Sequence, residues 1–342
     1  MKEYSNLEQL SFDDILLVPQ HSDISSRKDV SLRTRLGSGL GSIELDVPVL
    51  AAPMDTVCER EMAIAIRKAG GLGIMHRYSS VENQAYHIEM AKAFSAISGG
   101  SVGARGGFVS DAIHLVNAGA ALILIDVANG HSEHAIKAVK SLRSIFGKNL
   151  HIMAGNVASW DGYARLADAG ADSIRVGIGG GSACTTRVVS AHGVPTLASI
   201  IDIRKRVEYG TGPSIIADGG VRNSGDAAKA LAAGANVVML GRLLAGTTES
   251  PGDIIDGRKV FRGMASREAQ EEGRGSVSGV EGITTTVPFV GSVDNIINDF
   301  KAGLRSALSY TGVNNLIDFY HESMYNRVSS NSLNETKPHA KE

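Results

Sequence analysis

One hydrophobic pattern recurs along the chain. A helix-like segment ends in Ala-Gly-Ala or a near copy, and a short apolar run rich in β-branched residues follows. The copies lie at 69–71, 118–120, 169–171 and 233–235. A glycine at that place suits the left-handed residue that ends a helix. The almost continuously apolar runs are typical of parallel strands buried on both faces, so the pattern predicts helices alternating with parallel strands.

Extending this pattern over the chain gives eight candidate strands. They are 47–53, 72–76, 101–104, 121–127, 151–156, 173–178, 214–220 and 236–241. Amphipathic segments that predict helices are 59–69, 132–146, 160–169, 224–233 and 293–310. Eight strand–helix units are the number found in a (β/α)8 TIM barrel, an α/β fold. The main alternative, a doubly wound open sheet, usually carries a glycine fingerprint after its first strand, and VPVLAAPMDT has none.

The barrel interpretation assigns residues 1–342 to a single domain with three additions. An N-terminal extension, 1–46, contains one apolar stretch, DDILLVP. A polar, flap-like insertion at about 252–295 precedes the last predicted helix, and a polar tail begins at about Ser329. No linker separates a second domain.

Composition argues against several classes of protein. The 34 basic and 36 acidic side chains give a net charge of −2, whereas a protein that binds nucleic-acid backbones is normally basic. There is no apolar run of the length that spans a membrane, and the N-terminus lacks a signal-peptide pattern. Two cysteines cannot form a disulfide framework or a four-cysteine zinc site. We therefore expect a cytoplasmic protein without nucleic-acid or membrane partners.

The predicted strands end in small or polar residues. In a TIM barrel the loops at the carboxyl ends of the strands build the active site. Here those loops contain Met54–Thr56, Asp126–Gly130, Gly155–Asn156, Gly177–Arg187, Asp218–Gly220 and Gly241–Arg242. Forty glycines in 342 residues exceed the usual share of about 7%, which points to tight turns and close backbone–ligand approach. One shared pocket is predicted.

The loop GIGGGSACTTR carries the sharpest chemical signal. Its glycines free the backbone to fold tightly and to present N–H and C=O groups to a ligand. Cys184 lies within it, flanked by Ser182 and Thr186, and a thiol with a lowered pKa is a nucleophile. A buried, inert cysteine is the alternative, but the polar strand-end context favours chemistry. Cys58, at a helix start, is interpreted as structural.

Two further strand ends predict a phosphate site. Asp218-Gly219-Gly220 and Gly241-Arg242 follow the seventh and eighth strands, where barrels often bind phosphate. Backbone amides bind the oxygens, and an arginine adds charge. Plain turn glycines with a solvated Arg242 are the alternative. The histidines show no HExxH spacing, and no acidic cluster supports a metal site.

Taken together, these motifs resemble one family. From about Leu10 to at least Tyr310 the chain is similar to IMP dehydrogenases and GMP reductases. The matching stretches are LSFDDILLVP, VPVLAAPMDTV, DVANGHSEH, IMAGNV, GIGGGSACTTR, ADGG, LAGTTESPG, RGMAS and EGITTTVPF. The regulatory domain pair that many IMP dehydrogenases insert between the second and third barrel units is absent, since that segment holds only about 25 residues.

The resemblance implies a purine nucleoside monophosphate as substrate, a nicotinamide cofactor and a homotetramer. Cys184 would attack purine C2 and form a covalent thioimidate, which divides a hard substitution into two easier steps. In the reductase direction GMP loses ammonia and NADPH supplies hydride to give IMP. In the dehydrogenase direction IMP gives hydride to NAD, and water then releases XMP.

Differences within the family favour the reductase. A dehydrogenase carries an Arg-Tyr pair on its flap, and no such pair occurs between Met264 and Glu281. The reductase interpretation gives Thr186 and Glu281 the task of moving a proton to the leaving ammonia; taken alone, Glu281 fits a surface carboxylate equally well. RGMAS, LAGTTESPG and LNETKPH are dehydrogenase-like. An IMP dehydrogenase with an altered flap and a nucleotide-binding protein without turnover therefore stay open as alternatives.

The family pattern assigns the remaining site residues. The sugar and phosphate would be held by Ser182, Asp218, Gly219, Gly220, Gly241 and Arg242, and the base by Gly263, Met264, Ala265 and Gly282. The cofactor would meet Ser26, Arg27, Arg77, Asp126, Val127, Ala128, Ile178 and Gly179. The backbone carbonyls of Gly179, Gly181 and Cys184 resemble a potassium site. Arg242 departs from the family, which usually has a small residue there.

Overall fold

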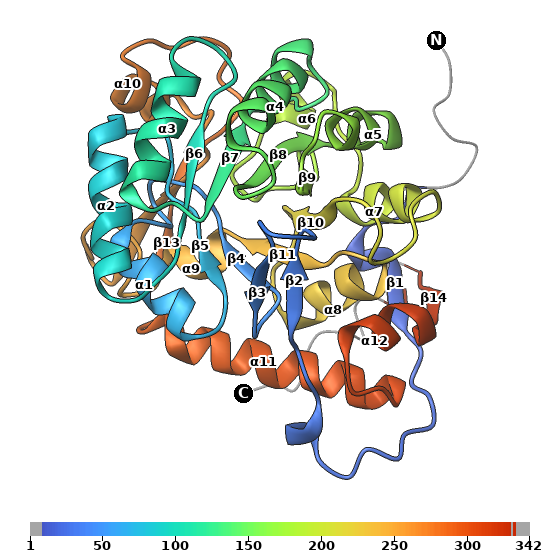
Figure 1. Cartoon of the computed structure of the whole chain (residues 1–342). Helices are drawn as coiled ribbons and strands as arrows, with labels where there is room; N and C mark the ends of the chain where they lie inside the picture. The colour runs from blue at the N-terminus through green and yellow to red at the C-terminus, as the bar shows by residue number, and fades with distance from the viewer. Residues whose placement is uncertain (1–8, 330, 333–342) are drawn as a thin grey trace.

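Eight parallel strands form the centre of the computed structural model, which describes residues 9–329 and 331–332 (Figure 1). The strands are β4 (Val49–Ala51), β5 (Leu72–Gly73), β6 (Gly99–Val102), β7 (Leu122–Asp126), β8 (His151–Val157), β9 (Ser173–Val176), β10 (Ser214–Asp218) and β11 (Val237–Leu240). Their order is β5-β4-β11-β10-β9-β8-β7-β6. A parallel bridge between Ile74 and Gly99 joins β5 to β6 and closes the circle. The predicted TIM barrel is confirmed.

Helices surround this barrel and alternate with its strands. They are α1 (Arg60–Lys68), α2 (Val81–Ala93), α3 (Phe108–Ala118), α4 (Glu133–Phe146), α5 (Trp160–Asp168), α7 (Thr196–Arg204), α8 (Ser224–Ala232) and α11 (Val293–Thr311). The five predicted helices begin and end within one residue of the observed bounds. Four of them start after a side chain that caps backbone N–H groups of the first turn, namely Ser132, Ser159, Asn223 and Ser292.

The glycine of each Ala-Gly-Ala copy takes the left-handed conformation that the pattern predicts. The φ angles are 102° at Gly70, 106° at Gly119, 103° at Gly170 and 107° at Gly234. A Cβ atom at Gly70 would lie 2.9 Å from the Asp46 side chain. Any other residue at these positions is strained, because L side chains rarely adopt this conformation. These glycines end one helix and direct the chain into the next buried strand.

The N-terminal extension contains more structure than its one apolar stretch predicts. After η1 (Phe12–Asp14), β1 (Ile15–Leu17) pairs antiparallel with β14 (Tyr325–Arg327), which follows α12 (Leu316–Glu322). A second hairpin joins β2 (Thr34–Leu36) to β3 (Ile43–Leu45), separated from β1 by η2 (Arg27–Asp29). Of the predicted tail, only Ser329, Asn331 and Ser332 belong to the described residues.

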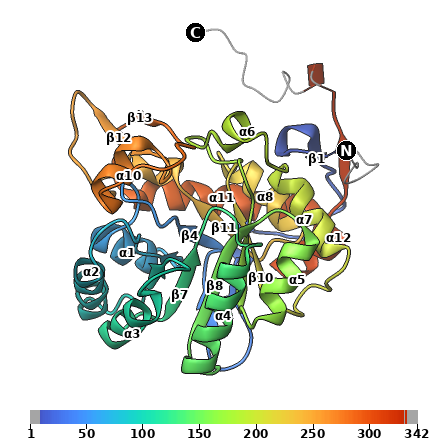
Figure 2. The same ribbon diagram turned by 90° about the horizontal axis from the view of Figure 1, so that it is seen from above.

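The insertion at 252–295 is an ordered hairpin. β12 (Arg258–Arg262) pairs antiparallel with β13 (Thr284–Pro288), and α10 (Arg267–Arg274) lies between them in sequence. Phe261 and Val287 are buried. Figure 2 shows β12, β13 and the short helix α6 (Thr186–Val189) along one edge of the molecule. The hairpin thus lies on the same side as the loop that contains Cys184.

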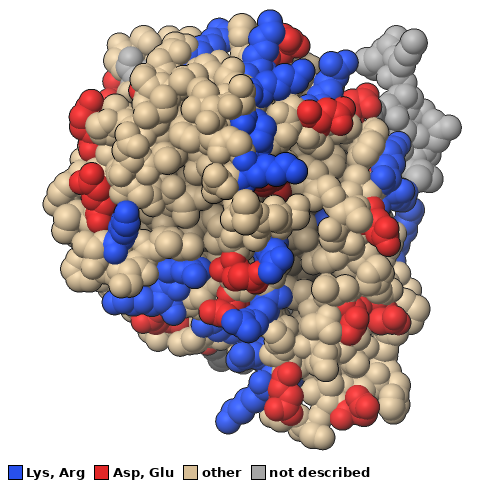
Figure 3. Space-filling view, viewed as in Figure 1, with Lys and Arg blue, Asp and Glu red and all other residues tan. Residues whose placement is uncertain are grey.

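The surface carries charges of both signs. On the face shown in Figure 3, basic and acidic side chains are interspersed, in keeping with 34 basic and 36 acidic residues in the sequence. Among the described residues, no helix combines the length and the apolar character needed to cross a bilayer.

Candidate active site

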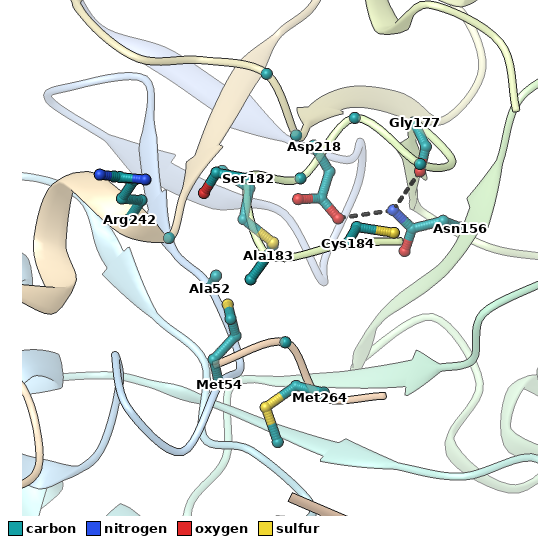
Figure 4. A pocket seen from close by; sticks show the side chains of 18 of the residues that line it. Ala52, Met54, Asn156, Gly177, Ser182, Ala183, Cys184, Asp218, Arg242 and Met264 are labelled. Atoms are coloured by element: carbon teal, nitrogen blue, oxygen red, sulfur yellow. Dashed lines mark hydrogen bonds between the residues drawn. The ribbon is translucent and has the colours of Figure 1, made fainter. Parts of the chain in front are cut away.

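A cavity of about 1020 Å³ opens at the carboxyl ends of the barrel strands. It brings together most of the residues predicted for the site. The predicted residues that line it are Arg77, Asp126, Val127, Ala128, Ile178, Gly179, Gly181, Ser182, Cys184, Thr186, Asp218, Gly219, Gly220, Gly241, Arg242, Gly263, Met264, Ala265 and Glu281. Figure 4 shows Cys184 beside Asn156 and Asp218, with Met264 and Met54 across the cavity.

The loop that carries Cys184 is fastened to the segment that leads into β13. Cys184 and Gly282 form an antiparallel bridge. The Thr185 N–H donates to the Glu281 carbonyl at 2.9 Å, and the Ile283 N–H donates to the Ala183 carbonyl at 3.0 Å. Two stretches almost 100 residues apart in sequence are thereby held in register, which fixes the Glu281 side chain near the thiol.

Glycine is required on the flap side of this contact. A Cβ atom at Gly263 would lie 2.8 Å from the Ala183 carbonyl oxygen, and one at Gly282 would lie 2.9 Å from the Ser266 nitrogen. Both distances are shorter than real Cβ contacts allow. A side chain at Gly263 would push the flap away from the Cys184 loop, and one at Gly282 would press against the backbone of Ala265 and Ser266 within the flap itself. Gly282 itself is not among the cavity-lining residues, but its backbone pairs with that of Cys184.

Three side chains form a hydrogen-bonded relay. The Cys184 Sγ donates to Thr186 Oγ1 at 3.2 Å, and Thr186 Oγ1 donates to the Glu281 carboxylate at 2.7 Å. Because the hydroxyl both accepts and donates, it connects the thiol to a base without direct contact between them. The relay can take the thiol proton as a thiolate forms and return a proton from the carboxyl group.

Both glycines after β10 adopt a left-handed conformation that L side chains rarely take. The φ angles are 94° at Gly219 and 86° at Gly220, and a Cβ atom at Gly219 would lie 3.0 Å from the Gly181 nitrogen. The loops after β9 and β10 therefore pack backbone against backbone, and successive N–H groups in such turns make anion-binding concavities. Ser182 also lines the cavity.

Arg242 borders this part of the cavity but extends away from Cys184 and Asp218 (Figure 4). It is exposed, and it makes no hydrogen bond or ion pair with another residue in the described part of the chain. Its charge is therefore available to a ligand.

A buried ion-pair network, which we did not predict, lies below the cavity. Arg175 donates from Nη1 to Asp126 Oδ1 at 2.7 Å and from Nη2 to Asp218 Oδ2 at 2.7 Å. The Asn156 amide donates to Asp218 Oδ2 at 2.7 Å, and the Arg77 Nε donates to Asp126 Oδ2 at 3.3 Å. Burial raises the pKa of Asp126, but the charges of Arg175 and Arg77 outweigh it and hold that pKa below its usual value.

The remaining predicted residues lie elsewhere. Ser26 caps η2, and the Arg27 guanidinium lies 5.8 Å from the centre of the Tyr310 ring; neither lines the cavity in this chain, and their contact with a cofactor stays a prediction.

Cys58 is fully buried, and burial raises the pKa of its thiol to about 12. The interpretation of Cys58 as structural is consistent with this, since a buried neutral thiol is inert.

Comparison with known proteins identifies the same family that the sequence motifs resemble. A family described as IMP dehydrogenase / GMP reductase domain matches residues 9–339. The chain is 37% identical to a GMP reductase of Shewanella halifaxensis, over 95% of this chain and 96% of that protein. It is 35% identical to an inosine-5'-monophosphate dehydrogenase of Borreliella burgdorferi, over 97% of both. A Trypanosoma brucei GMP reductase variant, solved in complex with guanosine 5'-monophosphate, superimposes with a TM-score of 0.91 at 27% identity, covering 99% of each chain.

Proposed function

Because the chain belongs to the IMP dehydrogenase / GMP reductase family, whose members are oxidoreductases of purine nucleotides, we propose that it is a GMP reductase. In this proposal it converts GMP to IMP with NADPH through a covalent bond to Cys184. The observation that carries the proposal is the relay from the Cys184 thiol through Thr186 to Glu281. The sequence between Met264 and Glu281 has no Arg-Tyr pair, so the group that would activate water for a dehydrogenase is missing.

The relay accounts for the first half of the reaction. The Cys184 proton passes through the Thr186 hydroxyl to the Glu281 carboxylate, and the thiolate forms a bond to C2 of the purine. The protonated Glu281 then returns that proton through Thr186 to the departing amino group, which leaves as ammonia. Hydride adds to C2 and the C2–S bond breaks. Overall, GMP, NADPH and two protons give IMP, NADP⁺ and ammonium.

The lining of the cavity supplies candidate groups for both ligands. Gly219, Gly220 and Arg242 would hold the phosphate, and Asp218 the ribose. Asp126, Val127 and Ala128 line the side where the cofactor would bind. When bound, the cofactor supplies the hydride. Arg77 uses only its Nε toward Asp126, and its two Nη groups donate no hydrogen bond within the described residues, which leaves them for a dinucleotide phosphate.

Potassium would fit the loop after β9. The Gly181 carbonyl accepts the Cys184 N–H at 3.1 Å, whereas within the described residues the carbonyls of Gly179 and Cys184 accept no hydrogen bond. Free carbonyl oxygens are suitable ligands for a hard monovalent cation. We propose that an ion there would hold the backbone on both sides of the nucleophile.

An IMP dehydrogenase is the second candidate. RGMAS and LAGTTESPG are dehydrogenase-like, and the similarity to the Borreliella burgdorferi dehydrogenase is nearly as high as that to the Shewanella halifaxensis reductase. Without the flap arginine, this reaction would stop at the covalent adduct after hydride transfer.

One assay distinguishes the candidates. GMP and IMP are each incubated with NADPH, NADH, NADP⁺ and NAD, and the absorbance of the reduced cofactor is followed. Loss of absorbance with GMP supports the reductase. Steady gain with IMP, accompanied by XMP, establishes the dehydrogenase instead. The absence of any change with all purine nucleotides, deoxynucleotides included, rejects both and leaves a binding protein.

A further inference from the structure

Arg175 joins the two halves of the cavity. It lies on β9, is only 8% exposed, and lines the cavity floor. Its guanidinium contacts two carboxylates at once, Asp126 at 2.7 Å through Nη1 and Asp218 through Nη2 at 2.7 Å and Nε at 3.0 Å. In the proposed function Asp126 faces the cofactor and Asp218 faces the nucleotide. One buried cation therefore connects a residue of each subsite.

The hydrogen bonds leave each carboxylate little freedom. Asp218 Oδ2 accepts from Arg175 and from the Asn156 amide at 2.7 Å. Asp218 Oδ1 accepts no hydrogen bond within the described residues and is not sealed inside the protein, so it is free for a ligand hydroxyl. Asp126 divides its two oxygens between Arg175 and Arg77. Turning either carboxylate would break charge-assisted bonds in a water-poor site.

We propose that Arg175 is a positioning residue that couples nucleotide binding to cofactor binding by fixing Asp126 and Asp218 together. The inference rests on the proposed function, because it requires both ligands to bind. Because these bonds connect the network, a ligand that shifts Asp126 also shifts Arg175 and Asp218. The second ligand then meets a carboxylate that is already displaced toward its bound position, and its binding is strengthened. By linkage, the effect is the same whichever ligand binds first.

A purely structural ion pair would behave differently. Loss of such a pair lowers the stability of the fold and the affinity for both ligands. It leaves unchanged the coupling ratio, which is the affinity for one ligand in the presence of the other divided by the affinity in its absence. The coupling ratio is therefore the diagnostic quantity. Arg204 offers a matched control, since it is also buried, donates to the Gly234 carbonyl at 2.7 Å and to Asn236 at 2.8 Å, and does not line this cavity.

The test uses the full chain carrying Cys184→Ala, which permits both ligands to bind without chemistry. The dissociation constant of GMP is measured by calorimetry without NADPH and with saturating NADPH. We expect a coupling ratio of about five-fold or more in this parent, the usual range for linked sites. Adding Arg175→Lys should bring the ratio toward one, while Arg204→Lys should leave it as in the parent. A ratio near one in the parent, or an undiminished ratio with Arg175→Lys, overturns the proposal.

Failure of the proposed function is distinguishable, because the unmodified chain would then oxidise no NADPH in the presence of GMP, a result that does not depend on the coupling ratio. If Arg175→Lys does not fold, Asp126→Asn provides the second measurement. This variant should likewise bring the coupling ratio toward one, because Arg175 loses one of its two anchors. An undiminished coupling ratio in Asp126→Asn rejects the coupling.

Discussion

Thr186→Val is the perturbation that tests the relay most directly. Valine has nearly the shape of threonine but no hydroxyl, so the backbone of α6 and the fit of the loop are retained. The variant removes both hydrogen bonds of Thr186, the one from Cys184 Sγ at 3.2 Å and the one to Glu281 at 2.7 Å. The thiol and the carboxylate both remain, but no group carries a proton between them.

The expected loss follows from these two bonds. A hydrogen bond to a charged acceptor contributes about 1.5–3 kcal/mol, and positioned proton transfer contributes typically about 10²–10⁴ in rate. With two connected transfers through one hydroxyl, we expect kcat to fall about 10³-fold, which corresponds to about 4 kcal/mol of transition-state stabilisation. KM for GMP should change little, because Thr186 acts on the thiol and on the leaving group and not on the sugar or phosphate.

The assay is steady-state oxidation of NADPH with GMP, together with single-turnover release of ammonia. Thr186→Ser is the matched control, since it keeps the hydroxyl and should retain kcat within about ten-fold. If Thr186→Val turns over within about three-fold of the unmodified protein, the thiol proton reaches its acceptor by another route and the relay is not the catalytic device.

Three more predictions follow from single residues. Cys184→Ala should abolish turnover and the covalent adduct, which intact-mass measurement detects, but it should still bind GMP, as calorimetry would show. Normal turnover of this variant would reject Cys184 as the nucleophile. Arg242→Ser should weaken GMP binding about ten-fold, the effect of one charged hydrogen bond, and leave guanosine binding unchanged; equal losses would argue against a phosphate contact. Burial lowers the pKa of His151 to about 4, below its unfolded value of about 6.5, so unfolding takes up a proton between these values and stability falls as pH drops. Between pH 7 and pH 5 the free energy of unfolding should fall by about 2 kcal/mol more in the unmodified protein than in His151→Gln. Urea unfolding at each pH measures this difference, and an equal fall in the two proteins would refute the prediction.

The sequence predicts the barrel well because its strands are buried on both faces. Continuous apolar runs between left-handed glycines have few other interpretations, and each predicted strand and helix contains the observed one to within a few residues. For the shortest strands, the predicted ranges are longer than the observed strands. β5 covers only Leu72–Gly73, and the pairing beyond it is reduced to an isolated bridge between Ile74 and Gly99.

The insertion was harder to predict because β12 exposes an apolar residue and buries a charged one. Val260 is exposed, whereas Lys259 is only 2% exposed and donates from Nζ to the Thr247 carbonyl at 3.0 Å. A lysine that faces inward reverses the polarity from which strand faces are normally assigned. The polar composition of this region therefore concealed a hairpin that holds Glu281 near Cys184.

Arg175 was hidden for a different reason, namely that its partners are defined only by strand register. In sequence it interrupts the apolar run of β9, 49 residues from Asp126 and 43 from Asp218. In the barrel, Asp126 on β7 is level with Gly155 on β8, and Gly155 is level with Arg175. A Cβ atom at Gly155 would lie 2.7 Å from that of Arg175, so the bare glycine leaves the space through which the guanidinium reaches Asp126.

On the other side of Arg175 the register supplies the second carboxylate. Arg175 is level with Ile216 on β10, and Asp218, two residues further along that strand, lies on the same face. A row of four neighbouring strands thus presents a carboxylate, a gap, a cation and a carboxylate. Apolar periodicity identifies each strand separately, but the pairing of these charges follows only from the alignment of the strands. For this reason Cys184 could be singled out in the sequence, whereas Arg175 could not.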